Sequence, residues 1–292
     1  MNILTFDIEE WYLEKEYFGD NQERYKKYDY YLNCILDELD YNNVKGTFFC
    51  VGGMGKDFPN VLKRIAVRGH EIGCHSYKHV WLNKLSEEEC MKDTQAAVDA
   101  LEQCIGKKVR SYRAPAFSIG EQNKWVFEVL TECGITRDAS IYPAVRDFGG
   151  FSDFGHKTPT IIKIGDKNIN EYPICTATVF GKEMAYSGGG YFRFFPLSFI
   201  KKEMAKSEYS MTYFHMADLI PENIMPLERS EYESYFKEPG SWKNRGIRYL
   251  KSNLGKKSAY RKIVKLINNT TFINLEQADN LINWETMPKF SL

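Results

Sequence analysis

Short apolar segments alternate with amphipathic helical segments along most of the chain, and this alternation limits the fold more than any other feature. Strand-like segments occupy residues 2–6, 47–51, 70–73, 109–112, 135–141, 160–174, 211–215 and 271–275. Helical periodicity occupies residues 30–39, 60–67, 86–104, 122–132, 197–206 and 242–267. Repeated strand–helix units predict an α/β fold with a mainly parallel sheet and helices outside it. Without an obvious linker in 292 residues, we expect one domain, residues 1–292, built as a distorted (β/α) barrel of seven or eight units.

Polar side chains that can take part in catalysis or metal binding follow the ends of several predicted strands. Asp7 follows NILTF, His75 follows HEIG, Arg113 follows VRSY, and His215 ends MTYFH. In barrels of this kind the chemistry lies at the carboxyl ends of the strands. We therefore expect these four residues to meet at one end of the barrel.

Three of the five histidines lie within ten residues, in GHEIGCHSYKH. His75 and His79 are four residues apart, so a helical turn or a tight loop can present both imidazoles to one cation. A polar surface loop is the simpler alternative. The strand end and the glycine that precede the pair favour a metal site.

The first predicted strand is followed by three acids, Asp7, Glu9 and Glu10. If the extended conformation continues, Asp7 and Glu9 lie on one side of the strand and enter one cavity. Two carboxylates then permit one to bind a metal and the other to accept a proton. A solvated acidic loop is the alternative.

The other two candidates have ordinary structural explanations as well. His215 ends an apolar strand, where it is either a core histidine or a functional one. Arg113 precedes Ala114-Pro115, where it is either a surface arginine or the partner of a buried carboxylate.

Four motifs in series resemble those of the polysaccharide deacetylases, carbohydrate esterase family 4. They are TFDIEEW (5–11), GHEIGCHSYKH (69–79), RAPAFS (113–118) and YFHM (213–216), and the likeness covers residues 2 to about 216. The segments SIYP (140–143) and GGGYFRFFP (188–196) resemble the branch found in bacterial exopolysaccharide and capsule gene clusters.

The resemblance implies a role for each matching position. Asp7 matches the catalytic base, and His75 and His79 match the two histidines that bind the metal. Arg113 matches the arginine that holds the base, and His215 matches the general acid.

One position departs from the family pattern, because Ile8 stands where the family has a second, metal-binding aspartate. We expect Glu9 to be the third ligand, with Glu10 as the alternative. His70 is expected to be structural. Two further expectations are that Asp138 supports the site and that residues 188–193 line the substrate cleft.

The implied activity is metal-dependent hydrolysis of an N-acetyl (or O-acetyl) group on a bacterial surface-polysaccharide sugar or its lipid-linked or nucleotide-linked precursor. The expected cofactor is Zn²⁺, although imidazole and carboxylate also accept Co²⁺ and Ni²⁺. Two alternatives remain open. One is a cyclic imide or ureide hydrolase on the same fold, and the other is a non-catalytic carbohydrate-binding relative.

The overall charge and the cysteines bear on the expected partners and on the cellular compartment. Lysine plus arginine equals aspartate plus glutamate, 39 each, so the overall charge gives no reason to expect a nucleic-acid partner. The seven cysteines form no CxxC pair and several lie in apolar runs, which suits a reducing compartment. No signal peptide or apolar membrane span is visible. We expect a cytoplasmic protein.

The segment at about 242–268 combines basic and apolar residues at helical spacing. A basic amphipathic helix can make weak contact with an anionic membrane surface. An outer barrel helix with a solvated face is the alternative.

Overall fold

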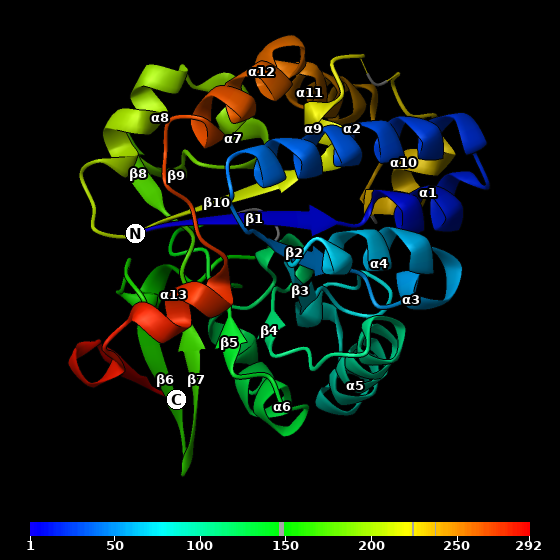
Figure 1. Ribbon diagram of the computed structural model, residues 1–292. Helices are drawn as coiled ribbons and strands as arrows, with labels where there is room; N and C mark the ends of the chain where they lie inside the picture. Colours follow the sequence, from blue (N-terminus) through cyan, green and yellow to red (C-terminus); the bar gives the residue numbers. More distant parts are fainter. Residues whose placement is uncertain (146–148, 224, 237) are drawn as a thin grey trace.

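One nine-stranded sheet forms the centre of the molecule, in the order β10-β1-β2-β3-β4-β5-β7-β6-β11. The computed structural model describes residues 1–145, 149–223, 225–236 and 238–292 (Figure 1). The strands of the sheet are β1 (Asn2–Ile8), β2 (Thr47–Cys50), β3 (Glu71–Cys74), β4 (Ser111–Tyr112), β5 (Arg137–Asp138), β6 (Thr160–Ile164), β7 (Lys167–Glu171), β10 (Ser210–His215) and β11 (Lys289–Ser291). A separate hairpin pairs β8 (Thr176–Val179) with β9 (Lys182–Ala185).

Seven neighbouring strands, from β10 to β7, run parallel, which confirms the predicted α/β fold class. β6 is antiparallel to β7 because the chain reverses at Gly165, whose φ of 53° suits glycine. Within the described residues the strands form a row with β10 and β11 at its edges. The barrel is therefore distorted and is not closed by a ring of strand pairs.

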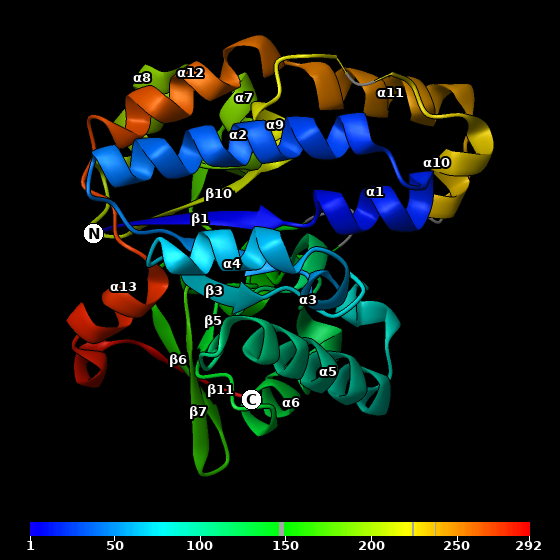
Figure 2. The ribbon, with the colours of Figure 1, turned by 45° about the vertical axis from the view of Figure 1, so that its right-hand side comes forward.

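Helices cover the outer side of the sheet, and α4, α5 and α6 pack against its strands (Figures 1 and 2). The α-helices are α1 (Glu10–Phe18), α2 (Gln22–Tyr41), α3 (Met54–Asp57), α4 (Pro59–Val67), α5 (Glu87–Ile105), α6 (Val126–Glu132), α7 (Gly189–Phe194), α8 (Leu197–Met204), α9 (Met216–Leu219), α10 (Arg229–Phe236), α11 (Trp242–Asn253), α12 (Lys256–Ile267) and α13 (Leu275–Leu281). No helix among the described residues is long and apolar enough to cross a membrane.

The local sequence signals explain where individual helices start and which side they bury. Ser86 and Glu89 form the predicted capping box, in which the Ser86 Oγ accepts from the Glu89 N–H and the Glu89 side chain accepts from the Ser86 N–H. α2 buries Leu32, Ile35 and Leu39, the spacing of one helical face.

The basic segment predicted as one helix divides into α11 and α12 at Gly255. This residue has a φ of 75°, and an added Cβ would lie 2.2 Å from the Arg193 carbonyl oxygen. The chain therefore needs both the left-handed backbone and the missing side chain of glycine at this point.

The strand expected at residues 271–275 is wrong. Ile273 makes only an isolated bridge to Ile3. The Asn274 side chain then accepts from the Gln277 N–H and starts α13, so the cap ends the extended segment. The last strand is instead β11, which pairs with β6.

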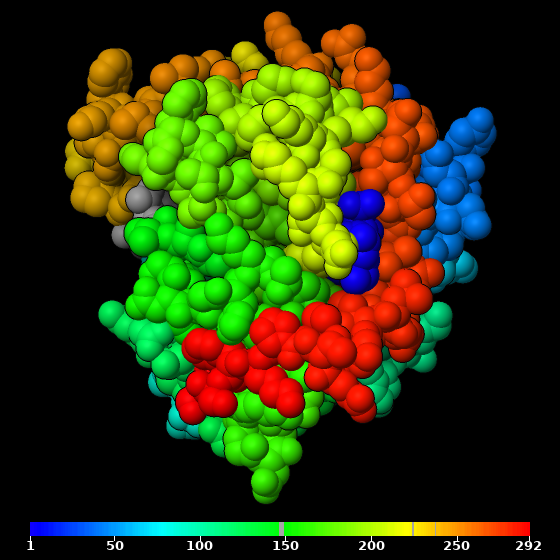
Figure 3. All heavy atoms as spheres, turned by 90° about the vertical axis from the view of Figure 1, so that its left-hand side faces the viewer, coloured from blue at the N-terminus to red at the C-terminus, as the bar shows by residue number. Residues whose placement is uncertain are grey.

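The two ends of the chain lie on the same side of the molecule as the start of β1. Figure 3 shows the N-terminal residues packed between a yellow segment near residue 208 and an orange segment near residue 271. The Met1 ammonium donates to the Glu208 carbonyl, and the Asn2 side chain donates to the Thr271 carbonyl. The carboxyl ends of the parallel strands are at the opposite end of the barrel.

His70 is buried away from the other histidines of its motif. Its Nδ1 accepts from the Gly46 N–H at 3.3 Å, and its Nε2 has no hydrogen-bond partner within the described ranges. Burial lowers the pKa of His70 from 6.5 to about 4, and Lys45 contributes in the same direction. The His70 side chain therefore has a structural role, as the sequence analysis expected.

We predict that replacing His70 by Gln reduces the acid sensitivity of folding. In the unfolded chain the imidazole takes up a proton near pH 6.5, whereas the folded chain resists this until about pH 4. Wild type should therefore lose about 3 kcal/mol of unfolding free energy from this group as the pH falls from 6.5 to 4. Urea unfolding across that range measures the effect. The matched control is His156→Gln, and equal pH slopes for wild type and His70→Gln would contradict the prediction.

Candidate metal centre and active site

The carboxyl ends of β1, β3 and β10 and the loop after β4 bring the predicted residues together. Asp7 on β1 is in register with His215 on β10 and with Phe49 on β2. Strand alternation places Thr5 and Asp7 on one face of β1, which is the face turned toward Arg113.

Arg113 is completely buried and makes an ion pair with Asp7. Its Nη1 lies 2.7 Å from the Asp7 Oδ1 and 2.7 Å from the Thr5 Oγ1, and its Nε donates to the Ala139 carbonyl at 3.1 Å. The guanidinium also stacks 4.3 Å from the centre of the Phe49 ring. These contacts fix one oxygen of Asp7 and leave Oδ2 facing His215.

Glu9, His75 and His79 form a cluster whose ligand atoms all lie within 4.8 Å of one another. The Glu9 Oε2 is 3.3 Å from the His75 Nε2 and 2.7 Å from the His79 Nε2. Each of these three residues offers one ligand atom to the cluster. Two histidines and one carboxylate are a donor set that suits a divalent cation and leaves other coordination positions open.

Glu9 reaches this point by a different route from the one that strand periodicity suggested. β1 ends at Ile8, and Glu9 is the N-cap of α1, with φ −131° and ψ −22°. The side chain therefore turns into the site from the start of a helix. Burial raises the pKa of Glu9, but His79, His215 and His75 outweigh it and hold that pKa well below its usual range.

The two histidines are set by a tight loop and not by a helix. Ser76 and His79 both have left-handed backbones, with φ of 64° and 58°. The His75 Nδ1 lies 2.6 Å from the Arg113 carbonyl, so an Nδ1–H donates there and Nε2 stays free to bind a metal. The same arginine thus orients Asp7 through its side chain and His75 through its backbone.

His215 lies next to both Asp7 and Glu9. Its Nε2 is 3.7 Å from the Asp7 Oδ2 and 3.7 Å from the Glu9 Oε1, and its Nδ1 is 3.2 Å from the Asp218 Oδ2. Burial lowers the pKa of His215, but Glu9, Asp218 and Asp7 together raise it well above its usual value. The three carboxylates around His215 therefore favour its protonated form.

Behind His215 lies Asp218, which the sequence analysis missed. The Asp218 Oδ1 is 2.9 Å from the Nε of buried Arg193, and burial lowers the pKa of nearby Lys256 to about 8. Asp218 follows His215 by three residues, and that spacing was the available signal. Arg193 belongs to the segment 188–193 that was expected to line the substrate cleft, and its side chain lies against Asp218, whereas Gly188 packs directly against Tyr213. The role of this segment in a cleft stays a prediction.

Glu10 does not belong to the metal cluster. Its Oε1 accepts from the Ala217 N–H at 2.6 Å. Burial, and then the neighbouring Glu9 charge, raise the pKa of Glu10 to about 7. The Glu10 carboxyl group is thus hydrogen-bonded at the start of α9, whereas the Glu9 carboxylate contacts the histidines.

Asp138 lies outside the metal cluster and supports the backbone beside Arg113. Its Oδ1 accepts from the Ser140 hydroxyl at 2.5 Å, and the Ser140 Oγ accepts from the Ala114 N–H at 2.8 Å. Burial raises the pKa of Asp138 and, with the Asp138 charge, raises the pKa of Glu171 well above the usual value. Asp138 is thus linked to the backbone next to Arg113 and touches none of the metal cluster.

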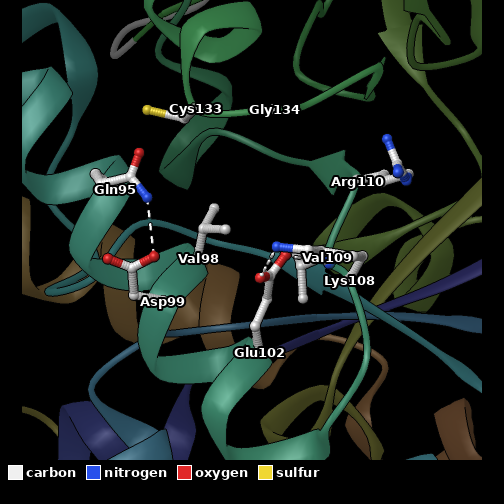
Figure 4. Close-up of a pocket in the computed structure, with 9 residues that line it drawn as sticks. All are labelled: Gln95, Val98, Asp99, Glu102, Lys108, Val109, Arg110, Cys133 and Gly134. Atoms are coloured by element: carbon white, nitrogen blue, oxygen red, sulfur yellow. Dashed lines mark hydrogen bonds and ion pairs between the residues drawn. The ribbon is translucent and has the colours of Figure 1, made fainter.

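A hollow of about 240 Å³ elsewhere on the molecule offers no comparable chemistry. It lies between α5 and the chain before β4, and the residues drawn in Figure 4 line it. Four of its polar side chains pair locally, Lys108 with Glu102 at 2.7 Å and Gln95 with Asp99 at 2.9 Å. We therefore place the function at the strand ends.

Two family models match most of the chain. Residues 4–137 match the family described as polysaccharide deacetylase, and residues 139–279 match a domain of unknown function, DUF3473. The metal cluster lies in the first segment, and His215, Asp218 and Arg193 lie in the second.

Curated relatives agree with the first match. A peptidoglycan-N-acetylglucosamine deacetylase of Bacillus cereus is 41% identical over 95 residues, which are 32% of this chain and 34% of that protein. A chitooligosaccharide deacetylase of Rhizobium leguminosarum bv. trifolii is 34% identical over 84 residues, 27% of this chain and 39% of that protein. The chain thus spans little more than a third of the length of these relatives.

A solved structure extends the likeness in fold to the whole chain. The crystal structure of a Mycobacterium smegmatis protein assigned as a polysaccharide deacetylase superposes with a TM-score of 0.64 at 19% identity, covering 100% of this chain and 92% of that one. The fold is therefore the distorted (β/α) barrel of polysaccharide deacetylases. The likeness to the polysaccharide deacetylase family model thus covers residues 4–137, and the solved structure adds a likeness in fold over the whole chain.

We predict that Glu9→Gln weakens the binding of Zn²⁺ about 100-fold or more, because it removes one of three converging ligands. Glu10→Gln should leave Zn²⁺ affinity within about threefold of wild type, since Glu10 bonds to Ala217. Isothermal titration calorimetry of the metal-free protein with Zn²⁺, repeated with Co²⁺, measures both. If Glu10→Gln lost as much affinity as Glu9→Gln, the ligand assignment would be wrong.

We also predict that Arg113→Met destabilises the fold by about 3–5 kcal/mol, because it leaves Asp7 as a buried, unpaired charge. The double variant Asp7→Asn/Arg113→Met should recover part of this loss. Urea unfolding at pH 7 measures the free energies. Arg229→Met, which breaks an exposed pair with Glu233, is the control and should cost less than about 1 kcal/mol. A cost equally small for Arg113→Met would refute the structural role of the buried pair.

Proposed function

We propose that the protein is a metal-dependent deacetylase that removes the N-acetyl (or O-acetyl) group from a sugar of a bacterial surface polysaccharide or its precursor. The observation that supports this most is that His215 lies 3.7 Å from both Asp7 and Glu9, so that an acid and a base meet beside the Glu9–His75–His79 cluster. A base and an acid next to a candidate Lewis-acid site are the groups that acyl hydrolysis needs. The deacetylase relatives point to the same reaction, and they do not favour a cyclic imide hydrolase or a non-catalytic module.

Glu9, His75 and His79 would hold the metal, for which Zn²⁺ is the expected ion and Co²⁺ or Ni²⁺ are substitutes. When bound, it would polarise the acyl carbonyl and lower the pKa of water. Asp7 would accept the proton of the attacking water through Oδ2, since Arg113 occupies Oδ1. Asp218 and Arg193 would hold His215 so that its Nε2–H donates to the departing sugar nitrogen or oxygen.

The substrate and its setting are part of the same proposal. SIYP and GGGYFRFFP support a place in exopolysaccharide or capsule synthesis, with the substrate a glycan or its lipid-linked or nucleotide-linked precursor. The cysteines support a reducing cytoplasm, because burial raises the pKa of the Cys50 and Cys74 thiols well above the usual value and they pack as small hydrophobes.

We predict that Asp7→Asn lowers kcat for acetate release by about 10³-fold and that His215→Ala lowers it by about 10²-fold, the range for general acid–base groups. Both variants should still bind Zn²⁺, because neither residue is one of the three ligands. The assay measures acetate released from an N-acetylated chitooligosaccharide by metal-loaded protein, with an acetyl ester and a cyclic imide as alternative substrates.

Asp166→Asn, on the turn between β6 and β7, serves as the surface control and should keep wild-type turnover. Urea unfolding separates loss of catalysis from loss of folding, since Asp7 is also the partner of Arg113. Wild-type turnover by Asp7→Asn would refute its role as base. Turnover of the imide without acetate release would refute the deacetylase assignment.

A further inference from the structure

α11 presents its apolar residues to solvent. Trp242 is 85% exposed, Leu250 67% and Ile247 42%, and Leu254 at the end of the helix is 53% exposed. Ile247, Leu250 and Leu254 are spaced three and four residues apart, so they share one side of the helix. A surface helix normally turns such a stripe toward the core. A contiguous exposed apolar face marks an interaction surface.

The polar side chains of α11 hold the helix to the protein. Arg245 donates to the Leu227 carbonyl at 3.0 Å, and Arg248 lies 4.1 Å over the Phe236 ring. Arg193 donates to the Lys251 carbonyl at 3.0 Å. The helix is thus attached through arginines, and its apolar side is left outward.

The segment that carries this face is strongly basic. No aspartate or glutamate occurs between Glu238 and Glu276, although the whole chain is neutral. Within this interval, the exposed cations are Lys243, Lys251, Lys257, Arg261 and Lys265. Lys243 and Lys251 lie on α11 itself, among the exposed apolar side chains. The face therefore joins exposed tryptophan and leucine to positive charge with no acidic residue in between.

We propose that α11 binds the surface of an anionic lipid bilayer. Trp242, Ile247, Leu250 and Leu254 would enter the headgroup region, where tryptophan is favoured, and the lysines would contact lipid phosphates. Charge complementarity selects this partner over a second copy of the chain, because pairing two such faces would bring like charges together. Each lysine near an anionic surface contributes about fivefold to partitioning.

α10 connects this surface to the candidate active site. Figures 1 and 2 show α10 and α11 next to each other at the end of the molecule toward which the β1 arrow points. Tyr235 on α10 packs 5.0 Å from Tyr17 on α1, the helix that begins at the Glu9 cap. If the proposed function holds, bilayer binding brings the site close to lipid-linked glycans. The binding itself does not depend on that function.

Sedimentation with vesicles tests the proposal on the full chain without substrate. We expect binding to vesicles of phosphatidylglycerol and phosphatidylcholine in equal parts at low salt, and little binding to pure phosphatidylcholine. Lys243→Glu/Lys251→Glu should weaken partitioning about 25-fold or more. Trp242→Ser/Leu250→Ser should weaken it about tenfold or more by removing interfacial apolar area.

Two matched controls use exposed residues on other helices. Lys201→Glu/Lys202→Glu on α8 has the same charge change, and Leu281→Ser on α13 removes a leucine that is 73% exposed. Both should bind as wild type does. Glu9→Gln should also keep vesicle binding, so failure of the metal site and failure of this proposal can be told apart.

Three outcomes would overturn the proposal. They are no sedimentation with anionic vesicles, equal weakening by the control substitutions, and self-association through this face. Light scattering coupled to gel filtration detects the last, as a dimer without lipid that Trp242→Ser/Leu250→Ser dissociates.

Discussion

The buried ion pair between Arg113 and Asp7 is the constraint on which the site depends. Asp7 comes from the first strand and Arg113 from the loop after β4, 106 residues later. The guanidinium also bonds to Thr5 and the Ala139 carbonyl, and the Arg113 carbonyl accepts from His75. One residue thus joins the ends of β1, β3 and β5, through its side chain and its backbone carbonyl. Such a pair is costly to bury unless every contact is satisfied, so these strand ends are held in one arrangement.

The two family segments supply different parts of the site. Residues 4–137 contain Asp7, Arg113 and the metal cluster, whereas His215, Asp218 and Arg193 lie in the segment matched to a domain of unknown function. The two segments share one sheet, because β10 of the second pairs with β1 of the first. This pairing places His215 beside Asp7. Hence the second segment completes the site and is not an accessory next to it.

The sequence allowed prediction of the parts that follow from local pattern. Parallel strands bring their carboxyl ends to one edge, so the positions of Asp7, His75, Arg113 and His215 after strand-like segments are enough to group them. Tertiary contacts could not be read in the same way. Arg193 reaches Asp218 only because α7 folds back behind β10, and the extended segment near residue 273 ends because Asn274 caps α13. Those outcomes depend on packing partners far away in the sequence.

Ile8 stands where the family pattern has an acid, and the point at which β1 ends shows how Glu9 takes its place. Alternation along the strand turns Asp7 toward Arg113 and Ile8 to the opposite, apolar side, where Ile8 is completely buried. In this chain position 8 is therefore part of the core, and the acid comes one residue later. Glu9, as the first residue beyond the strand, adopts the N-cap conformation and swings its longer side chain back between the two histidines. Arg113 binds Asp7 on the strand, and Glu9, just beyond the end of the strand, contacts the two imidazoles. The end of β1 thus separates the two acids, so that each has its own partner.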